Sequence, residues 1–227
     1  MIEPYFQDEM TTIYCSKCED VLPQLTSGLV YLTDQPYGTG WVRGGGKVGD
    51  FNARYEKEAW DVWSLEWLKL LVDPKRIAAF CPPSKVDELA WALPQPAVMH
   101  YRKTNVRPGG IDREPIVVSP PPQAKRWKFE AYNGDMEFHR CQKPLDLMLW
   151  LVRELSEAGD IIVDRFMGSG TTLIAAKRFG RRAVGIDERE DYCQIAVQRL
   201  SQKELFGIEN GHGTLVAGRV LAVQTHN

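Results

Sequence analysis

The sequence has no long hydrophobic run and no basic leader at its start. Its longest apolar stretch, Leu147–Val152, is far shorter than the roughly 20 residues of a transmembrane helix. The first ten residues carry no basic segment followed by an apolar one, as a signal peptide would. We therefore expect a cytoplasmic protein with no membrane partner.

Cysteine is scarce, and its positions form no regular pattern. Five cysteines, an odd number, are scattered along 227 residues, which favours a reducing compartment over a disulfide framework. Cys15 and Cys18 form a single C-x-x-C, but no second pair or suitably spaced histidines follow it, so we expect no metal. The chain also lacks a basic excess, since its formal net charge is -2. Any contact with nucleic acid must therefore be local.

Length and composition indicate one globular domain. The 227 residues are 44% hydrophobic and 26% charged, which suits a single α/β domain, here residues 1–205 followed by a C-terminal tail, 206–227. Apolar runs of strand type alternate with helical patterns, which predicts a mainly parallel seven-stranded sheet. The expected strands are Thr12–Cys15, Leu29–Thr33, Ile77–Cys81, Ala97–Tyr101, Pro115–Ser119, Ile161–Asp164 and Ala183–Asp187. The expected helices are Asp61–Leu71, Lys85–Leu93, Pro144–Ala158, Thr171–Phe179 and Arg189–Leu205.

A glycine-rich turn marks a nucleotide-binding β-α-β unit near the end of this domain. Gly168 and Gly170 follow an apolar strand, and Asp187 ends the next strand, where a carboxylate can accept both hydroxyls of a ribose. Leu173 stands where a dinucleotide motif has its third glycine, and no Gly-Lys-Ser/Thr follows. The pattern favours an adenosine cofactor; the plain alternative is a tight turn before a buried helix.

The residues of this turn resemble a known motif. DRFMGSGTT followed by GID is similar to the cofactor motif of amino-group DNA methyltransferases, whose usual form is Asp-Pro-Phe-x-Gly-Ser-Gly-Thr-Thr; Arg165 replaces the proline. The segment HRCQKPLDL resembles the family's His-x-x-Gln-Lys-Pro helix. The resemblance implies S-adenosylmethionine as cofactor. It places Asp187 on the ribose and implies the other cofactor-binding residues Gln142, Lys143, Asp164, Phe166, Gly168, Ser169, Gly170, Thr171 and Thr172.

A second motif, Asp34-Gln35-Pro36-Tyr37, follows the strand Leu29–Thr33. An exocyclic amine is a poor nucleophile until acceptors aimed at its hydrogens free its lone pair. The Asp34 carboxylate and the Gln35 backbone carbonyl can supply those acceptors, and Tyr37 can stack on a flipped base. The family's form is Asp-Pro-Pro-Tyr, so Gln35 is a departure from it. Read without the resemblance, the four residues are an ordinary β-turn.

The order of these motifs resembles the circularly permuted β class of the family. The turn Asp34–Tyr37, called here the catalytic turn, comes first, the Lys-Pro helix second, and the glycine turn, called here the cofactor turn, last. This order implies a Rossmann-like methyltransferase fold and an enzyme that methylates adenine N6 in the DNA of a bacterial or phage-infected cell. Cytosine N4, an RNA substrate and a catalytically silent DNA-binding or partner subunit stay open as alternatives. A cytosine C5 enzyme is disfavoured because the sequence has Cys81-Pro82 in place of Pro-Cys.

The DNA contacts are expected in two long loops. Residues 38–59, rich in glycine and charge, are interpreted as a mobile loop that orders on DNA. Residues 106–138 form a reduced recognition region, so sequence recognition should be short or lax, and a homodimer is a hypothesis for how duplex DNA is held. A local basic excess, which a solvated loop would also explain, is assigned to phosphate binding. Its residues are Arg102, Lys103, Arg107, Arg113, Lys125 and Arg126.

Overall fold

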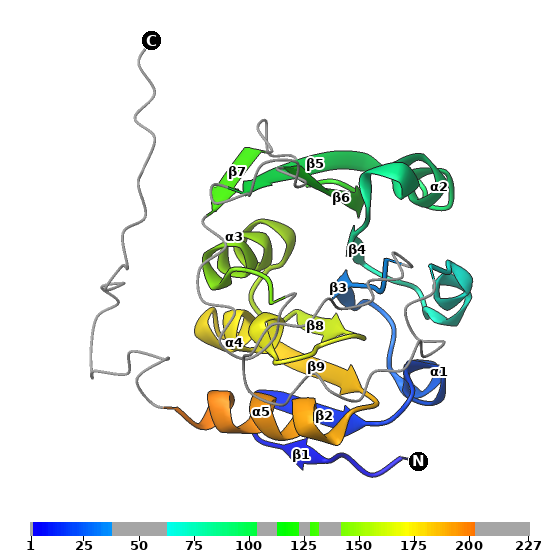
Figure 1. Cartoon of the computed structure of the whole chain (residues 1–227). Helices are drawn as coiled ribbons and strands as arrows, with labels where there is room; N and C mark the ends of the chain where they lie inside the picture. The colour runs from blue at the N-terminus through cyan, green and yellow to red at the C-terminus, as the bar shows by residue number, and fades with distance from the viewer. Residues whose placement is uncertain (1, 38–62, 104–112, 123–127, 132–141, 203–227) are drawn as a thin grey trace, which may run out of the picture.

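The fold is built around one twisted sheet. The computed structural model describes residues 2–37, 63–103, 113–122, 128–131 and 142–202. In these ranges, nine strands form the sheet in the order β1-β2-β9-β8-β3-β4-β6-β5-β7 (Figure 1). The strands are β1 Phe6–Gln7, β2 Thr11–Cys15, β3 Val30–Asp34, β4 Arg76–Phe80, β5 Ala97–Lys103, β6 Arg113–Ser119, β7 Lys128–Ala131, β8 Ile161–Asp164 and β9 Arg182–Asp187.

All seven predicted strands are present, and the mainly parallel α/β class is confirmed. β2, β9, β8, β3 and β4 pair in parallel, as do β5 and β7, whereas β1 and β6 run antiparallel to their neighbours. The expected count of seven was too low, because β1 and β7 add a strand at each edge. β1 has only two residues, too few for a periodic pattern, and β7 lies inside the stretch interpreted as recognition loop.

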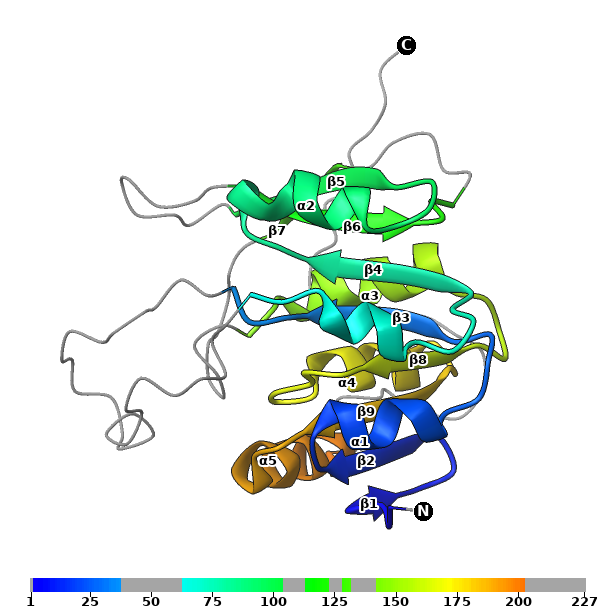
Figure 2. The ribbon, with the colours of Figure 1, turned by 90° about the vertical axis from the view of Figure 1, so that its right-hand side faces the viewer.

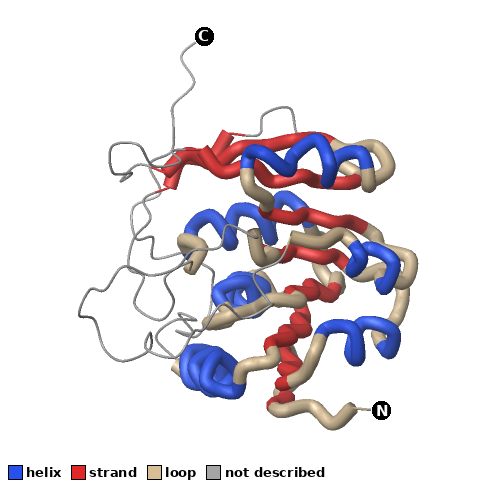
Figure 3. Tube along the Cα trace, turned by 45° about the vertical axis from the view of Figure 1, so that its right-hand side comes forward, coloured by secondary structure: helices blue, strands red, loops and turns tan. Residues whose placement is uncertain are grey.

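Helices cover both faces of the sheet. The α-helices are α1 Cys18–Val21, α2 Val86–Trp91, α3 Leu145–Leu155, α4 Thr171–Arg178 and α5 Glu190–Ser201; the 3-10 helices are η1 Leu22–Gln24, η2 Glu66–Leu70 and η3 Pro83–Lys85. Figure 1 shows α3 and α4 on one side of the sheet and α1 and α2 on the other, and the side view and the tube give the same division (Figures 2 and 3).

Alternating strand residues supply two separate cores. In β3, Val30 and Leu32 join the cluster that also holds buried residues of α3, α4 and α5. Tyr31, between them, joins the cluster on the opposite face, with Trp67 of η2 and Leu89 of α2. A period of two along a buried strand produces this arrangement, and it explains why both faces of the central strands are apolar.

One predicted helix is wrong. The segment Asp61–Leu71 was expected to be an α-helix, but its described part contains only the short 3-10 helix η2. Trp67 is the only residue of η2 that is fully buried, so tertiary packing supports little more than one turn. Residues 61 and 62, the predicted loop 38–59 and the tail 206–227 lie outside the described residues.

The connections create a switch point between β8 and β3. From β8 the chain passes through α4 to β9, and from β3 it returns through η2 to β4, on the other face of the sheet. Ligands of open α/β sheets bind outside the carboxyl ends of two neighbouring strands whose connections leave to opposite faces of the sheet. Asp34 at the end of β3 and Asp164 at the end of β8 therefore lie where a ligand is expected to bind. Among the described helices, none is long and apolar enough to span a bilayer.

The glycine turn permits a direct test of its packing. Gly170 has φ +78°, and a Cβ there would lie 2.8 Å from Cβ of Ala196 in α5. We expect Gly170→Ala to lower the free energy of unfolding by at least about 2 kcal/mol more than Gly180→Ala does. Gly180 is the matched control, because its φ is +66° but a Cβ there would meet nothing within 4 Å. Urea unfolding measures both variants, and equal losses would contradict the packing argument.

Candidate active site

The cofactor turn is held by a buried carboxylate at the end of β8. Asp164 Oδ2 accepts a hydrogen bond from Thr172 Oγ1 at 2.5 Å, and its Oδ1 accepts one from the backbone N–H of Phe166 at 3.2 Å. Burial raises the pKa of Asp164 to about 7, against these two hydrogen bonds. Asp164 thus ties the strand end to the first turn of α4 and orients the loop that leads to Gly168.

Asp187 reaches the same turn from the end of β9. Its Oδ2 accepts the backbone N–H of Gly168 at 3.0 Å, and its Oδ1 accepts that of Arg189 at 3.0 Å. Burial raises the pKa of Asp187 to about 6. The structure therefore brings the predicted glycine turn and its acidic partner into direct contact, and each carboxylate oxygen keeps a lone pair for a further donor.

An arginine of α5 braces the turn, which sequence reasoning did not foresee. Arg199 is 4% exposed, and its Nη1 donates to the Ser169 carbonyl at 2.5 Å and to Thr171 Oγ1 at 3.2 Å. Ser169 Oγ also lies 3.4 Å from Gln142 Oε1. The predicted residues Gln142, Ser169 and Thr171 are thereby gathered at one place.

The catalytic turn lies beside the cofactor turn. β3 pairs with β8 in parallel register, with Val30 opposite Ile162 and Tyr31 opposite Val163. The carboxyl ends of both strands thus meet at one edge of the sheet. Asp34 ends β3 with its side chain 24% exposed, and Gln35, the next residue, is 3% exposed.

Lys143 lies between two carboxylates at this edge. Its Nζ is 2.8 Å from Asp34 Oδ2 and 2.9 Å from Glu114 Oε1. It also lies 4.8 Å from the ring centroid of Phe80 and 5.5 Å from that of Tyr37. Burial alone would lower the pKa of Lys143, but the two carboxylates raise it above its ordinary value. Lys143, whose side chain is 11% exposed, is therefore a largely buried cation bound to Asp34 of the catalytic turn. The sequence had placed it among the cofactor-binding residues.

Glu114 of β6 is the functional residue that the sequence did not reveal. It is 3% exposed and accepts hydrogen bonds from the hydroxyls of Tyr37 and Tyr101, the latter at 2.5 Å. Lys103 Nζ lies 3.1 Å from its Oε2. Burial would raise the pKa of Glu114, but Lys143 and Lys103 with the two tyrosines lower it to about 2.

Asp34 keeps one oxygen without a partner. Burial raises the pKa of Asp34, opposed by Lys143 and reinforced by Glu114. Among the described residues, Oδ1 of Asp34 has no hydrogen-bond partner, whereas Oδ2 is bound to Lys143. The carboxylate is thus fixed through one oxygen, and the other can accept a donor.

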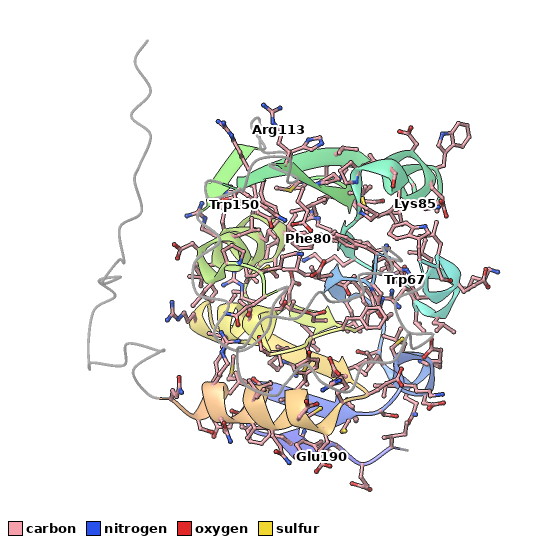
Figure 4. The ribbon with its side chains drawn as sticks, in the orientation of Figure 1. Trp67, Phe80, Lys85, Arg113, Trp150 and Glu190 are labelled. Atoms are coloured by element: carbon pink, nitrogen blue, oxygen red, sulfur yellow. The ribbon has the colours of Figure 1, made fainter. Side chains whose placement is uncertain are left out.

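The predicted DNA-binding residues do not form one group. Arg102 and Arg113 lie opposite each other on β5 and β6, and both are exposed. Figure 4 shows Arg113 on the outer side of β5 and β6, far from the interior Phe80. Lys103, by contrast, is bound to Glu114 at the site. Arg107, Lys125 and Arg126 lie outside the described residues.

A family comparison matches the second half of the domain. A family model described as DNA methylase, of the N6 and N4 type, matches residues 119–198, which include the Lys-Pro helix and the cofactor turn. This segment of the chain is therefore similar to the N6/N4 DNA methylase family. The type II methyltransferase M2.DpnII of Streptococcus pneumoniae is 47% identical over 73 residues, which is 32% of this chain and 26% of that protein. The chain thus covers about a quarter of the length of this methylase.

Two solved structures have a similar fold. The M1.HpyAVI–SAM complex superposes with a TM-score of 0.62 at 23% identity, covering 84% of this chain and 100% of that one. The PvuII DNA methyltransferase, described as cytosine-N4-specific, gives a TM-score of 0.60 at 13% identity, covering 93% and 91%. The Rossmann-like methyltransferase fold is therefore confirmed.

The depressed pKa of Glu114 leads to a pH-dependent stability difference. Because its pKa falls from 4.5 to about 2 on folding, ionised Glu114 stabilises the folded state by roughly 3 kcal/mol above pH 4.5. We expect Glu114→Gln to lose most of this stabilisation at pH 7. Its free energy of unfolding should approach that of the wild type as the pH falls from 4.5 towards 2. Urea unfolding at several pH values measures it. Glu66→Gln is the control, since the Glu66 side chain is 76% exposed; a pH-independent loss in Glu114→Gln would contradict the assignment.

Proposed function

We propose that this protein transfers a methyl group from S-adenosylmethionine to the exocyclic N6 amine of adenine in DNA. The observation that carries the proposal is the state of Asp34. One oxygen is fixed by Lys143 and the other is unpartnered among the described residues, beside the glycine turn at the switch point. Such a carboxylate can accept one hydrogen of an amine and direct the nitrogen lone pair toward a methyl donor.

The residues of the cofactor turn fit this donor. Asp187 has lone pairs to receive ribose hydroxyls, and a Cβ at Gly168 would meet nothing within 4 Å, so the backbone there is open to close approach. The sulfonium methyl of the bound cofactor supplies the electrophile. Ser169 and Thr171, which Arg199 binds, and Gln142, which accepts from Ser169 Oγ, would bind its methionine end.

The catalytic turn would hold the base. The hydroxyl of Tyr37 donates a hydrogen bond to Glu114, which fixes the position of the ring. Because the ring is already ordered, stacking on a flipped base would cost no further side-chain entropy. The Gln35 backbone carbonyl is the second amine acceptor. The cofactor would supply the methyl group and leave as a neutral thioether. Asp34 and this carbonyl would hold the two amine hydrogens, and the proton on the Asp34 side would leave the nitrogen to the carboxylate as the N–CH3 bond forms.

The substrate and setting are parts of the same proposal. DNA is supported by the family match, and the exposed Arg113 lies where it could contact a phosphate. We expect recognition of a short site or lax specificity, in the cytoplasm of a bacterial or phage-infected cell, and a homodimer on DNA as a further hypothesis. Methylation of cytosine N4 is the second candidate, because the same fold carries that specificity in the PvuII enzyme.

Mass spectrometry of modified DNA tests the activity. The purified protein is incubated with S-adenosylmethionine and unmethylated DNA, which is then digested to nucleosides. N6-methyladenine would support the proposal, and N4-methylcytosine would keep the mechanism with another base. Cofactor binding without any methylated nucleoside would overturn it in favour of an RNA substrate or a silent partner subunit.

The role of Asp34 predicts a selective loss. We expect Asp34→Asn to lower kcat by about 100-fold or more, because removing one pre-organised charged group costs 10²–10³ in rate, while the Kd of the cofactor stays within a few-fold. Single-turnover methylation and calorimetric titration with S-adenosylmethionine measure the two quantities. If kcat changes less than about fivefold, Asp34 is not the amine acceptor.

The raised pKa of Asp34 predicts an acidic limb in the pH profile. Because only the ionised carboxylate activates the amine, kcat should fall as the pH falls through the pKa of Asp34. Burial raises that pKa above its ordinary value of 3.8, so the limb should lie above the range of an ordinary carboxylate. Stopped assays from pH 3.5 to pH 8 at saturating cofactor measure it. A kcat that stays constant from pH 8 down to pH 3.8 would contradict a raised pKa.

A further inference from the structure

Gln35 and Arg165 each replace a proline of the two motifs that contain them, and the structure brings them together. Each directly follows an aspartate of the site, Gln35 after Asp34 and Arg165 after Asp164. Arg165 Nη2 donates a hydrogen bond to Gln35 Oε1 at 3.2 Å. The two side chains are 4% and 3% exposed, so the bond is shielded from water.

Arg165 has unusual surroundings for a buried cation. Its guanidinium lies 4.1 Å from the ring centroid of Trp67 and 4.2 Å from that of Phe166, and Nη1 donates to Cys18 Sγ at 3.7 Å. No carboxylate of the described residues forms an ion pair with it. Burial lowers its pKa to about 10, so it stays charged at neutral pH.

The energetic cost of burying Arg165 indicates that its role goes beyond packing in the core. Burying a guanidinium without a carboxylate costs several kcal/mol, and cation–π contacts return only part of that cost. A stability role alone would be served better by an apolar side chain of similar volume. The feature that an apolar residue could not provide is the directed hydrogen bond to Gln35.

The position of Gln35 gives that bond a consequence for the site. Gln35 lies between Asp34 and Pro36, and a residue before proline is restricted to extended backbone conformations. Fixing its side chain as well leaves the backbone carbonyl of Gln35 one orientation relative to Asp34. Trp67 of η2, the first element described after the catalytic turn, packs against the guanidinium of Arg165.

We propose that Arg165 is a positioning residue that acts through Gln35, fixing the catalytic turn against the cofactor turn so that Asp34 and the Gln35 carbonyl face the amine together. This inference rests on the proposed function. It assigns to the two unusual residues a single shared role, and it predicts that neither acts without the other.

A double-mutant cycle tests the pair. Gln35→Met keeps the side-chain length and removes the acceptor, whereas Arg165→Met removes the donor together with the charge and shortens the side chain. Arg153→Met is the matched control, since the Arg153 side chain is 58% exposed on α3. We expect each single variant to lower kcat about tenfold, as small misplacements of reacting groups do, with the KM of the cofactor within about threefold. The double variant should be no slower than either single one. Losses that multiply in the double variant, or an unchanged kcat in the singles, would overturn the proposal.

Unfolding measurements on the same variants separate the possible failures. Coupling between the two residues in the free energy of unfolding tests the pairing whether or not the protein turns over, and Gln35→Met serves alone if Arg165→Met fails to fold. Wild-type protein without turnover would overturn the proposed function and the catalytic part of this inference. An active wild type with uncoupled variants would overturn this inference only.

Discussion

The arrangement of the site depends on one buried lysine between two carboxylates. Lys143 precedes α3, Asp34 ends β3 and Glu114 is the second residue of β6, so a single ammonium joins three segments that are far apart in the sequence. At separations near 3 Å and away from water, these attractions are strong, and removing any one charge would leave the others uncompensated. Lys103 supplies the second positive charge, so the four groups are neutral together.

This balance explains why Asp34 can remain reactive. A carboxylate buried beside Glu114 would be protonated more readily, because burial and the neighbouring charge both raise its pKa. Lys143 opposes that rise, and Glu114 is itself kept ionised by its own partners. The result is a carboxylate fixed through one oxygen, in a setting of low dielectric constant where the other oxygen is a strong acceptor.

Much of this site was predictable from local sequence, because both turns directly follow apolar strands. The carboxyl ends of parallel strands meet at one edge, so Asp34 and Gly168 could be placed together from their positions alone. Glu114 escaped notice because it lies at the start of a strand. β6 runs antiparallel to β4 and pairs Ile116 with Phe80, and this direction brings the start of β6 to the same edge. The hydrophobic pattern of a strand does not predict the direction in which it runs in the sheet. Arg199 escaped for a similar reason, since a helix pattern does not show which turn its arginine will reach.

The two residues that replace motif prolines, Gln35 and Arg165, have a meaning together that neither has alone. Taken singly, Gln35 and Arg165 each replace a rigid residue with a flexible polar one and suggest a weakened site. Taken together in space, they form one shielded hydrogen bond backed by two aromatic rings. The same reasoning limits the interpretation of Lys103, which the sequence groups with phosphate-binding residues but which is bound to Glu114 inside the site. Lys103 therefore contributes to the charge balance around Glu114, whereas Arg102 and Arg113 are exposed opposite each other on β5 and β6.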